Sequence, residues 1–198
     1  MKNIMQENRK FFNKIAGYYD KGIFKNLLLN PIKNAVEFVN VKKGSKILDA
    51  GCGTGNLLKI LEDENKNLRL YGIDISEEML KVARKKLKLV KIKLGSVEKL
   101  NFKKDFFDYI FSIDAFHHYY NSTLVMRNFY RILKKGGYLV IVDFSFSIFF
   151  NKIFSRIEPG NSGMHTAFEF KELFKSYKFK DIRQKRLGLF NILTIGRK

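Results

Sequence analysis

The stretch Ile47-Leu48-Asp49-Ala50-Gly51-Cys52-Gly53-Thr54-Gly55 decides the fold. An apolar run ends in an aspartate and three glycines spaced G-x-G-x-G, and an expected helix follows over residues 56–63. A strand that passes through a glycine turn into a helix is typical of a nucleotide-type cofactor site. Glycines suit such a turn because no Cβ keeps the backbone away from the ligand.

The spacing of this turn argues against a dinucleotide. The dinucleotide fingerprint is G-x-G-x-x-G, and Asn56 occupies the place of its third glycine here. Asp49, just before the glycines, would repel a pyrophosphate and attract a cofactor that carries positive charge. The turn is not a phosphate-binding Walker loop either, because no Gly-Lys-Ser/Thr follows it.

A second carboxylate, Asp74, ends the next expected strand, 23 residues after Gly51 (74 − 51). A carboxylate at that point can accept hydrogen bonds from both ribose hydroxyls. One aspartate at a strand end is weak by itself, since turns favour Asp. Together with the glycine turn, Asp74 indicates a cofactor that contains a nucleoside.

Strands and helices alternate through the middle of the chain. The expected strands are 46–50, 68–73, 90–94, 107–113 and 138–142, and the expected helices are 56–63, 76–87 and 122–133. Ser76 would cap the second of these helices, and Gly136–Gly137 would end the third. Such alternation predicts parallel βαβ units with right-handed crossovers.

The C-terminal part breaks this alternation. After a helix over 168–176, residues 179–186 and 190–195 read as two strands joined across Gly188, which makes the pair antiparallel. The predicted fold is α/β, Rossmann-like and doubly wound, with a mostly parallel seven-stranded sheet and an antiparallel C-terminal strand. The expected organisation is a single domain over 1–198, with these parts: N-terminal helical cap 1–42, cofactor-binding core 43–143, substrate-side segment 144–167, C-terminal helix and hairpin 168–198.

Composition bounds the class of protein. The chain has 198 residues, a net charge of +19 and a single cysteine, so an internal disulfide is impossible and a reducing cytoplasm is expected. The longest apolar stretch, 144–154, is interrupted by polar residues and is too short to span a membrane, which takes roughly 20 apolar residues. The charge could signal nucleic acid or an anionic membrane surface, but lysines are spread throughout.

The chain resembles the class I S-adenosylmethionine-dependent methyltransferases, especially their small-molecule branch, closely over about residues 43–142. The resemblance implies S-adenosyl-L-methionine as the cofactor. The residues it implies as cofactor contacts are Asp49, Gly51, Gly53 and Gly55 for the methionine part, Asp74 for the ribose, Ile75 and Met79 for the adenine, and also Ser96, Val97, Asp114 and Tyr19. Ser96 departs from the pattern, because the family often has an aspartate there that binds the adenine amino group. Plain helix packing is nearly as good an explanation of Met79.

The methyl acceptor would lie between two further segments. Residues 11–20 resemble the opening of quinone C-methyltransferases, and Tyr18 or Tyr19 would cover the cofactor. The phenylalanine-rich segment 144–154 would form the other wall, or would simply pack in the core. His117 is the candidate catalytic base, with a loop-anchoring role equally open, and His118 is expected to anchor the loop.

Three functions compete. The favoured one is a methyltransferase acting on a small, hydrophobic or lipid-like acceptor, with possible contact to an anionic membrane. The second is a nucleic-acid methyltransferase. Against it, the fourth strand lacks an Asp/Asn-Pro-Pro-Tyr motif, and Cys52 lies inside the cofactor turn rather than in a Pro-Cys nucleophile. The third is a non-catalytic cofactor-binding subunit, although nothing in the motif is damaged. We expect neither a metal nor a specific nucleic acid, and leave the oligomeric state open.

Overall fold

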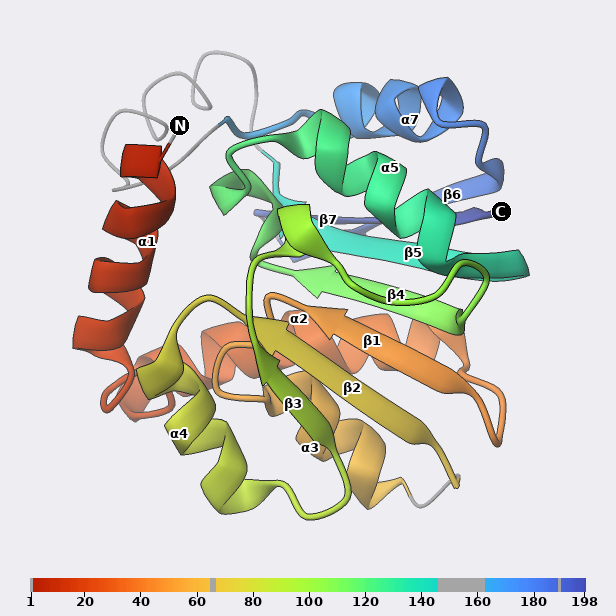
Figure 1. Cartoon of the computed structure of the whole chain (residues 1–198). Helices are drawn as coiled ribbons and strands as arrows, with labels where there is room; N and C mark the ends of the chain where they lie inside the picture. The colour runs from red at the N-terminus through yellow and green to blue at the C-terminus, as the bar shows by residue number, and fades with distance from the viewer. Residues whose placement is uncertain (1, 65–66, 146–162, 189) are drawn as a thin grey trace.

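A single seven-stranded sheet forms the centre of the molecule (Figure 1). The computed structural model describes residues 2–64, 67–145, 163–188 and 190–198. The strands lie in the order β3-β2-β1-β4-β5-β7-β6. Their bounds are β1 (Lys46–Ala50), β2 (Arg69–Asp74), β3 (Lys91–Leu94), β4 (Phe107–Ile113), β5 (Leu133–Phe144), β6 (Lys180–Leu187) and β7 (Asn191–Arg197). β7 runs antiparallel to β5 and β6, and the other pairs are parallel, which confirms the predicted fold.

Helices cover both faces of this sheet. Their bounds are α1 (Lys2–Ile15), α2 (Gly22–Val39), α3 (Asn56–Asp63), α4 (Glu77–Lys86), α5 (Ser122–Ile132) and α7 (Ala167–Ser176), with the 3-10 turns η1 (Val97–Lys99) and η2 (Phe116–His118). One core cluster joins α2, α3 and α4 to one face of the sheet, and a second joins α5 and α7 to the other. None of the helices in these described parts is long and apolar enough to cross a membrane.

The two cores follow from the alternation of side chains along each strand. In β4, Ile110 belongs to the core under α5 and α7, while its neighbours Tyr109 and Phe111 belong to the core under α2 and α3. A parallel strand covered on both faces needs apolar residues at successive positions, which explains the runs that the sequence shows. Each fully buried Leu, Ile or Phe contributes about 1.5–3 kcal/mol.

The helix α4 begins as its sequence predicts. The Ser76 hydroxyl accepts a hydrogen bond from the Met79 backbone N–H at 3.1 Å and so caps the helix. Glu77 and Glu78 stand in the first turn and three basic residues in the last, which suits the helix dipole.

The expected end of the helix before β5 was wrong. α5 ends at Ile132, and β5 begins at Leu133 and runs through both Gly136 and Gly137. The pairing of β4 with β5 shifts there, because Phe107 faces Leu133 while Tyr109 faces Tyr138. The Gly136 N–H donates to the carbonyl of Lys198 at 2.8 Å, and the Lys198 N–H donates to the carbonyl of Gly137 at 2.9 Å. Pairing with a distant segment therefore made this turn part of a strand.

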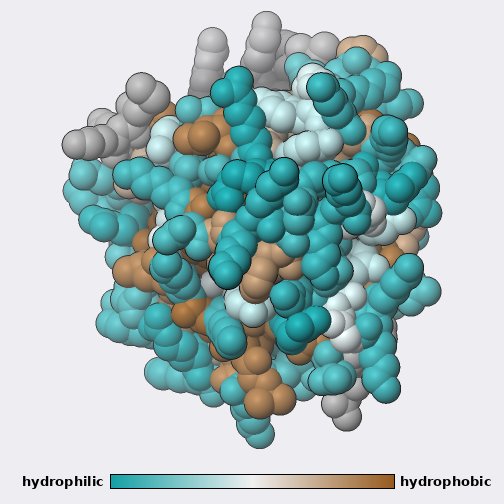
Figure 2. Space-filling model, turned by 45° about the vertical axis from the view of Figure 1, so that its right-hand side comes forward, coloured by the Kyte–Doolittle hydropathy of each residue, from teal (hydrophilic) through white to brown (hydrophobic). Residues whose placement is uncertain are grey.

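The first helix, α1, belongs to neither layer. Figure 1 shows it standing at the edge of the sheet where β1 and β4 end. On the face of the molecule seen in Figure 2, hydrophilic side chains cover most of the surface, with smaller hydrophobic areas between them. The space between α1 and the strand ends is where the candidate site lies.

Candidate functional site

A pocket opens between α1 and the carboxyl ends of the parallel strands, and it includes about 980 Å³ of space not filled by atoms, its open mouth counted. That is the region where open α/β sheets bind their ligands. Most of the predicted cofactor residues line it, namely Tyr19, Asp49, Gly51, Gly53, Asp74, Ile75, Met79, Val97 and Asp114.

Two predicted cofactor residues do not line this pocket. Gly55 has a φ of +79°, and a Cβ on it would lie 2.7 Å from the Leu87 side chain, so this glycine serves the close packing of the loop on α4. The Ser96 hydroxyl instead donates a hydrogen bond to the carboxylate of Glu98. Glu98 itself is buried and lines the pocket.

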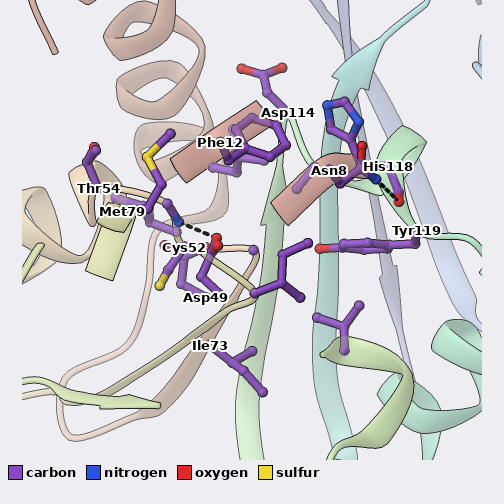
Figure 3. A pocket seen from close by; sticks show the side chains of 18 of the residues that line it. Asn8, Phe12, Asp49, Cys52, Thr54, Ile73, Met79, Asp114, His118 and Tyr119 are labelled. Atoms are coloured by element: carbon purple, nitrogen blue, oxygen red, sulfur yellow. Dashed lines mark hydrogen bonds between the residues drawn. The ribbon is translucent and has the colours of Figure 1, made fainter. Parts of the chain in front are cut away.

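Sequence reasoning missed several pocket residues. They include Met5, Asn8, Glu98, Tyr119 and Tyr120, together with Thr54 and Asn56 in and beside the glycine turn, whereas Phe12 lies in the predicted segment 11–20. Figure 3 shows Asn8 and Phe12 of α1 across the pocket from Asp49 and Ile73 at the strand ends. The sequence offered the glycine turn for Thr54 and Asn56 and the acidic residue two positions after Ser96 for Glu98. Met5 and Asn8 lie outside the segment 11–20 and have no comparable pattern.

Backbone hydrogen bonds hold the glycine turn against the end of β2. The N–H groups of Gly51 and Cys52 donate to the carbonyl of Ile73 at 2.9 and 3.0 Å. The Gly53 N–H donates to one carboxylate oxygen of Asp74 at 2.8 Å, and the Ser76 N–H donates to the other at 2.8 Å. Each oxygen of a carboxylate has two lone pairs, so Asp74 keeps acceptor capacity toward the pocket.

Gly51 is required by geometry. Its φ is +75°, and a Cβ added there would lie 2.7 Å from the Cβ of Ala115 and 3.0 Å from the hydroxyl of Tyr119. That hydroxyl donates to the Ala50 carbonyl at 2.8 Å. Any side chain at position 51 would therefore push the β4 end away from the turn.

Asp49 is a strongly perturbed carboxyl of the pocket. Its side chain is 3% exposed. Burial, with the nearby charge of Asp74, raises its pKa to about 8. Burial also raises the pKa of Asp74, although the N–H groups of Ser76 and Gly53 oppose this. A buried carboxyl and a half-buried carboxyl so close together favour a positively charged ligand, since a cation stabilises both in their ionised form.

Asp20, which follows α1 and Tyr19 in the sequence, holds the N-terminal segment to the glycine turn. One oxygen of Asp20 accepts hydrogen bonds from the Thr54 hydroxyl and the Asn56 amide, both at 2.9 Å. The other oxygen pairs with the Lys86 ammonium at 2.9 Å. Burial opposes ionisation of Asp20, but the hydrogen bonds from Asn56, Lys86 and Thr54 outweigh it and lower the pKa of this carboxyl.

Two asparagines hold α1 itself. The Asn8 amide nitrogen donates to the His118 carbonyl at 3.0 Å, and the Asn13 amide oxygen accepts from the Ser76 hydroxyl at 2.7 Å. Asn8, Asn13 and Asp20 are called the three anchors below. They tie one N-terminal segment to the loops after β4, β2 and β1.

The two adjacent histidines have different positions. His117 is 2% exposed, and its Nδ1 lies 2.5 Å from Asp143, whose other oxygen accepts from the His117 backbone N–H at 2.9 Å. His117 does not line the pocket, and its predicted role as a base stays a prediction. His118, expected only to anchor the loop, does line the pocket, with its ring 5.0 Å from that of Phe12 in an edge-to-face arrangement.

The two tyrosines predicted to cover the cofactor lie in different places, and only part of the predicted wall 144–154 can be located. Tyr19 lines the pocket, while Tyr18 is 74% exposed. Of the predicted wall 144–154, only Phe144 and Ser145 fall within the described residues, and the Phe144 ring lies 5.8 Å from that of His117. The rest of that prediction lies outside the described residues.

The family model and several of the sequence relatives that match this chain are methyltransferases. A family model described as a methyltransferase domain matches residues 41–182. The demethylmenaquinone methyltransferase of Listeria welshimeri is 33% identical over 145 residues, which cover 69% of this chain and 61% of the relative. The alignments cover 49% of one curated relative and 61% of another, so the match spans less than two thirds of the length of each.

Solved structures share the fold. A chain from the complex between the Haloferax volcanii Trm112 methyltransferase activator and a methyltransferase superposes with a TM-score of 0.80 at 19% identity, covering 94% of this chain and 96% of that one. Haemonchus contortus phosphoethanolamine N-methyltransferase 2, solved with S-adenosyl-L-methionine, gives a TM-score of 0.70 at 17% identity, covering 94% of this chain and 60% of that one.

Proposed function

This chain belongs to the methyltransferase-domain family of class I S-adenosylmethionine-dependent enzymes, and from that premise we propose that it transfers a methyl group to a small, hydrophobic or lipid-like acceptor. The observation that carries the proposal is a single pocket with buried carboxyls on the strand side and apolar side chains on the α1 side.

The residues present fit S-adenosylmethionine, whose ammonium and sulfonium carry positive charge. Asp49 has a raised pKa because burial and Asp74 disfavour its charged form, and a bound cation would relieve both effects. Asp74 would hold the ribose hydroxyls with the acceptor capacity that the Gly53 and Ser76 N–H groups leave. Gly51 would let the backbone approach the methionine part.

The adenine would lie beside Ile75, Met79 and Val97, three apolar side chains of the same pocket. Glu98 is the better candidate than Ser96 for the adenine amino group, because Glu98 lines the pocket while the Ser96 hydroxyl donates to the Glu98 carboxylate. The turn η1 that carries Glu98 is itself fixed, since the Asn128 amide donates to the Glu98 carbonyl at 2.9 Å.

When bound, S-adenosylmethionine supplies an activated methyl group, because the leaving group is a neutral thioether. The protein then has to align the acceptor with the methyl and exclude water. Apolar side chains of α1 serve both tasks, with Met5 and Phe12 closing the pocket opposite Asp49. His118 is the histidine placed to take a proton where an acceptor must lose one.

The hydrophobic acceptor is supported by the α1 side of the pocket. Met5 and Phe12 of α1 line it, and Tyr119 and Tyr120, which follow η2, add aromatic surface to the same pocket. The demethylmenaquinone methyltransferase relative acts, by its name, on a molecule of that character. We extend this to the present chain as the class of acceptor and not as a particular compound.

Contact with an anionic membrane surface is part of the same proposal. Arg9, Lys10 and Lys14 are exposed on α1, the helix that covers the pocket, and the exposed Tyr18 follows them. Each Lys or Arg near an anionic surface contributes about 1 kcal/mol of attraction. An acceptor dissolved in the membrane would thus be met by the helix that closes the site.

The test is transfer of a radiolabelled methyl group from S-adenosylmethionine into a fractionated cell extract. We expect label in the organic-soluble fraction with the wild-type protein and at least tenfold less with Asp74→Ala. Asp63→Asn, an exposed change on α3 remote from the pocket, is the matched control and should label like the wild type. Label that follows RNA or DNA and is removed by nuclease would contradict the proposal, and so would cofactor binding without transfer into any fraction.

A further inference from the structure

Asn8 carries a polar atom that has no partner in the part of the chain that the structure describes. Its side chain is 1% exposed and lines the pocket from α1. The amide oxygen is buried and accepts no hydrogen bond from the residues that the structure describes. A buried acceptor without a donor costs free energy, so such an atom calls for an explanation.

The orientation of this amide follows from its neighbour. The Asn8 nitrogen lies 3.0 Å from the backbone carbonyl of His118, which can only accept. The opposite amide orientation would place two acceptors against each other, so the oxygen is the free end. Figure 3 shows the Asn8 amide beside His118 and above Tyr119, on the side of the pocket away from Met79 and Thr54.

The surroundings of the amide are mostly aromatic, and besides the imidazole of His118 they include a tyrosine hydroxyl that is already hydrogen-bonded. Phe12, one turn further along α1, packs edge-on against His118. The Tyr119 hydroxyl is engaged with the Ala50 carbonyl and lies 2.9 Å from the Ser112 hydroxyl. Among the described α1 residues that line the pocket, Met5, Asn8 and Phe12, only Asn8 offers an oxygen as a hydrogen-bond acceptor, and it lies beside the aromatic rings of Phe12 and His118.

We infer that Asn8 orients the methyl acceptor by accepting a hydrogen bond from a hydroxyl or amine on an otherwise apolar, aromatic-sized molecule. The inference rests on the proposed function, because it assigns the α1 side of the pocket to the acceptor. It narrows the acceptor from any hydrophobic molecule to one with an O–H or N–H group on a flat apolar body. Asn8 thereby becomes a positioning residue for the acceptor.

The test compares two probes with the same ring and a different hydrogen-bonding group, 1-naphthol and 1-methoxynaphthalene. Their dissociation constants are measured calorimetrically with the protein saturated with S-adenosylhomocysteine, so that no turnover occurs. The variant is Asn8→Leu, which keeps the approximate size and removes the acceptor. The matched control is Asn13→Leu, the same change one and a half turns along α1, at an anchor that does not line the pocket.

We expect the wild type and Asn13→Leu to bind 1-naphthol at least tenfold more tightly than 1-methoxynaphthalene, and Asn8→Leu to bind the two within twofold of each other. Equal binding of the pair by the wild type, binding of neither, or loss of the preference in both variants would overturn the inference. Because turnover is absent, failure of the labelling assay contradicts the proposed function without deciding the role of Asn8.

A second measurement separates the acceptor from the cofactor, whose ammonium is also a hydrogen-bond donor. S-adenosylhomocysteine and 5′-methylthioadenosine differ by the amino-acid part that carries the ammonium. We expect Asn8→Leu to bind both within threefold of the wild type. A tenfold loss for S-adenosylhomocysteine alone would assign the Asn8 oxygen to the cofactor and overturn the inference.

Discussion

The two sides of the pocket are built differently. On the strand side, Asp49, Asp74 and Glu98 stand at or just after the ends of β1, β2 and β3, so neighbouring strands place them together. On the α1 side, Asn8 and Phe12 belong to a helix outside both layers, held by the three anchors. The strand side therefore depends on the fold itself, while the α1 side depends on a few side-chain hydrogen bonds.

This difference separates what cofactor binding requires from what acceptor binding and closure of the pocket require. A change on the strand side should weaken the binding of the cofactor whatever the acceptor is. A change on the α1 side should alter the acceptor or the closure of the pocket and leave the cofactor contacts in place. Each of the following predictions tests that separation, beginning with the largest expected effect.

Asp49→Asn should be the most damaging change for the cofactor. It removes the buried negative charge that we expect the cation to need, a loss of roughly 1.5–3 kcal/mol, or about tenfold to more than a hundredfold in Kd. Titration calorimetry with S-adenosylmethionine measures it, with Asp63→Asn as the exposed control. Unchanged affinity would show that Asp49 does not face the cofactor.

Asp74→Ala should weaken binding by about 1–3 kcal/mol, because buried ribose hydroxyls would lose their acceptor. The same loss should appear with 5′-methylthioadenosine, which keeps the ribose and lacks the charges that Asp49 would serve. An effect on S-adenosylmethionine alone would move Asp74 from the ribose to the charged part of the cofactor.

The affinity for S-adenosylmethionine should rise with pH. The pKa of Asp49 in the free protein is about 8, so at pH 6 the carboxyl is protonated and must release a proton when a cation binds. Affinity should increase by about tenfold from pH 6 to pH 7 and level off above pH 8. Asp49→Asn should remove this slope, and a flat profile in the wild type would be inconsistent with a protonated Asp49.

The Asp49 carboxyl also predicts that the stability of the ligand-free protein falls as the pH rises. A carboxyl whose pKa is raised on folding stabilises the protein fully at low pH, and that stability is lost as the pH rises from about 4 through 8. Asp49→Asn should therefore melt higher than the wild type at pH 9 and gain less at pH 5. Thermal melts without ligand measure this, and the wild type melting higher at pH 9 would contradict it.

Asp20→Asn should have the smallest effect and should leave the strand side intact. It keeps an oxygen for Thr54 and Asn56 but weakens the ion pair with Lys86, in which both side chains are about a quarter exposed. A loss of about 0.5–1 kcal/mol should raise amide hydrogen exchange in α1 by about two- to fivefold. Exchange in β1 and β2 should not change, and a rise there would mean that Asp20 supports the whole fold.

The strand side could be predicted from sequence because local patterns encode it. The glycine turn, Asp49 and Asp74 sit at fixed offsets from apolar runs, and the alternation of strands and helices orders the sheet. Prediction failed where a distant segment decided the outcome. β5 continues through Gly136 and Gly137 because these glycines pair with Lys198.

On the α1 side, the pattern over 11–20 marked the segment but did not give the partners of its residues. Asn8 meets His118 across 110 residues, and Asp20 meets Asn56 across 36. A lone asparagine on an amphipathic helix looks like any exposed polar residue until its partner is known. The choice of Glu98 over Ser96 depended on the shape of a three-residue turn, which the sequence does not specify.

The anchoring of α1 also affects how fast a bound ligand can leave the pocket. A ligand held beneath a helix can leave only as fast as that helix moves aside, and such openings usually take microseconds to milliseconds. The three anchors would then set how long the product stays bound. The ion pair between Asp20 and Lys86 would be the most salt-sensitive of their contacts. We expect turnover to speed up with ionic strength until loss of closure admits water and the chemical step becomes limiting.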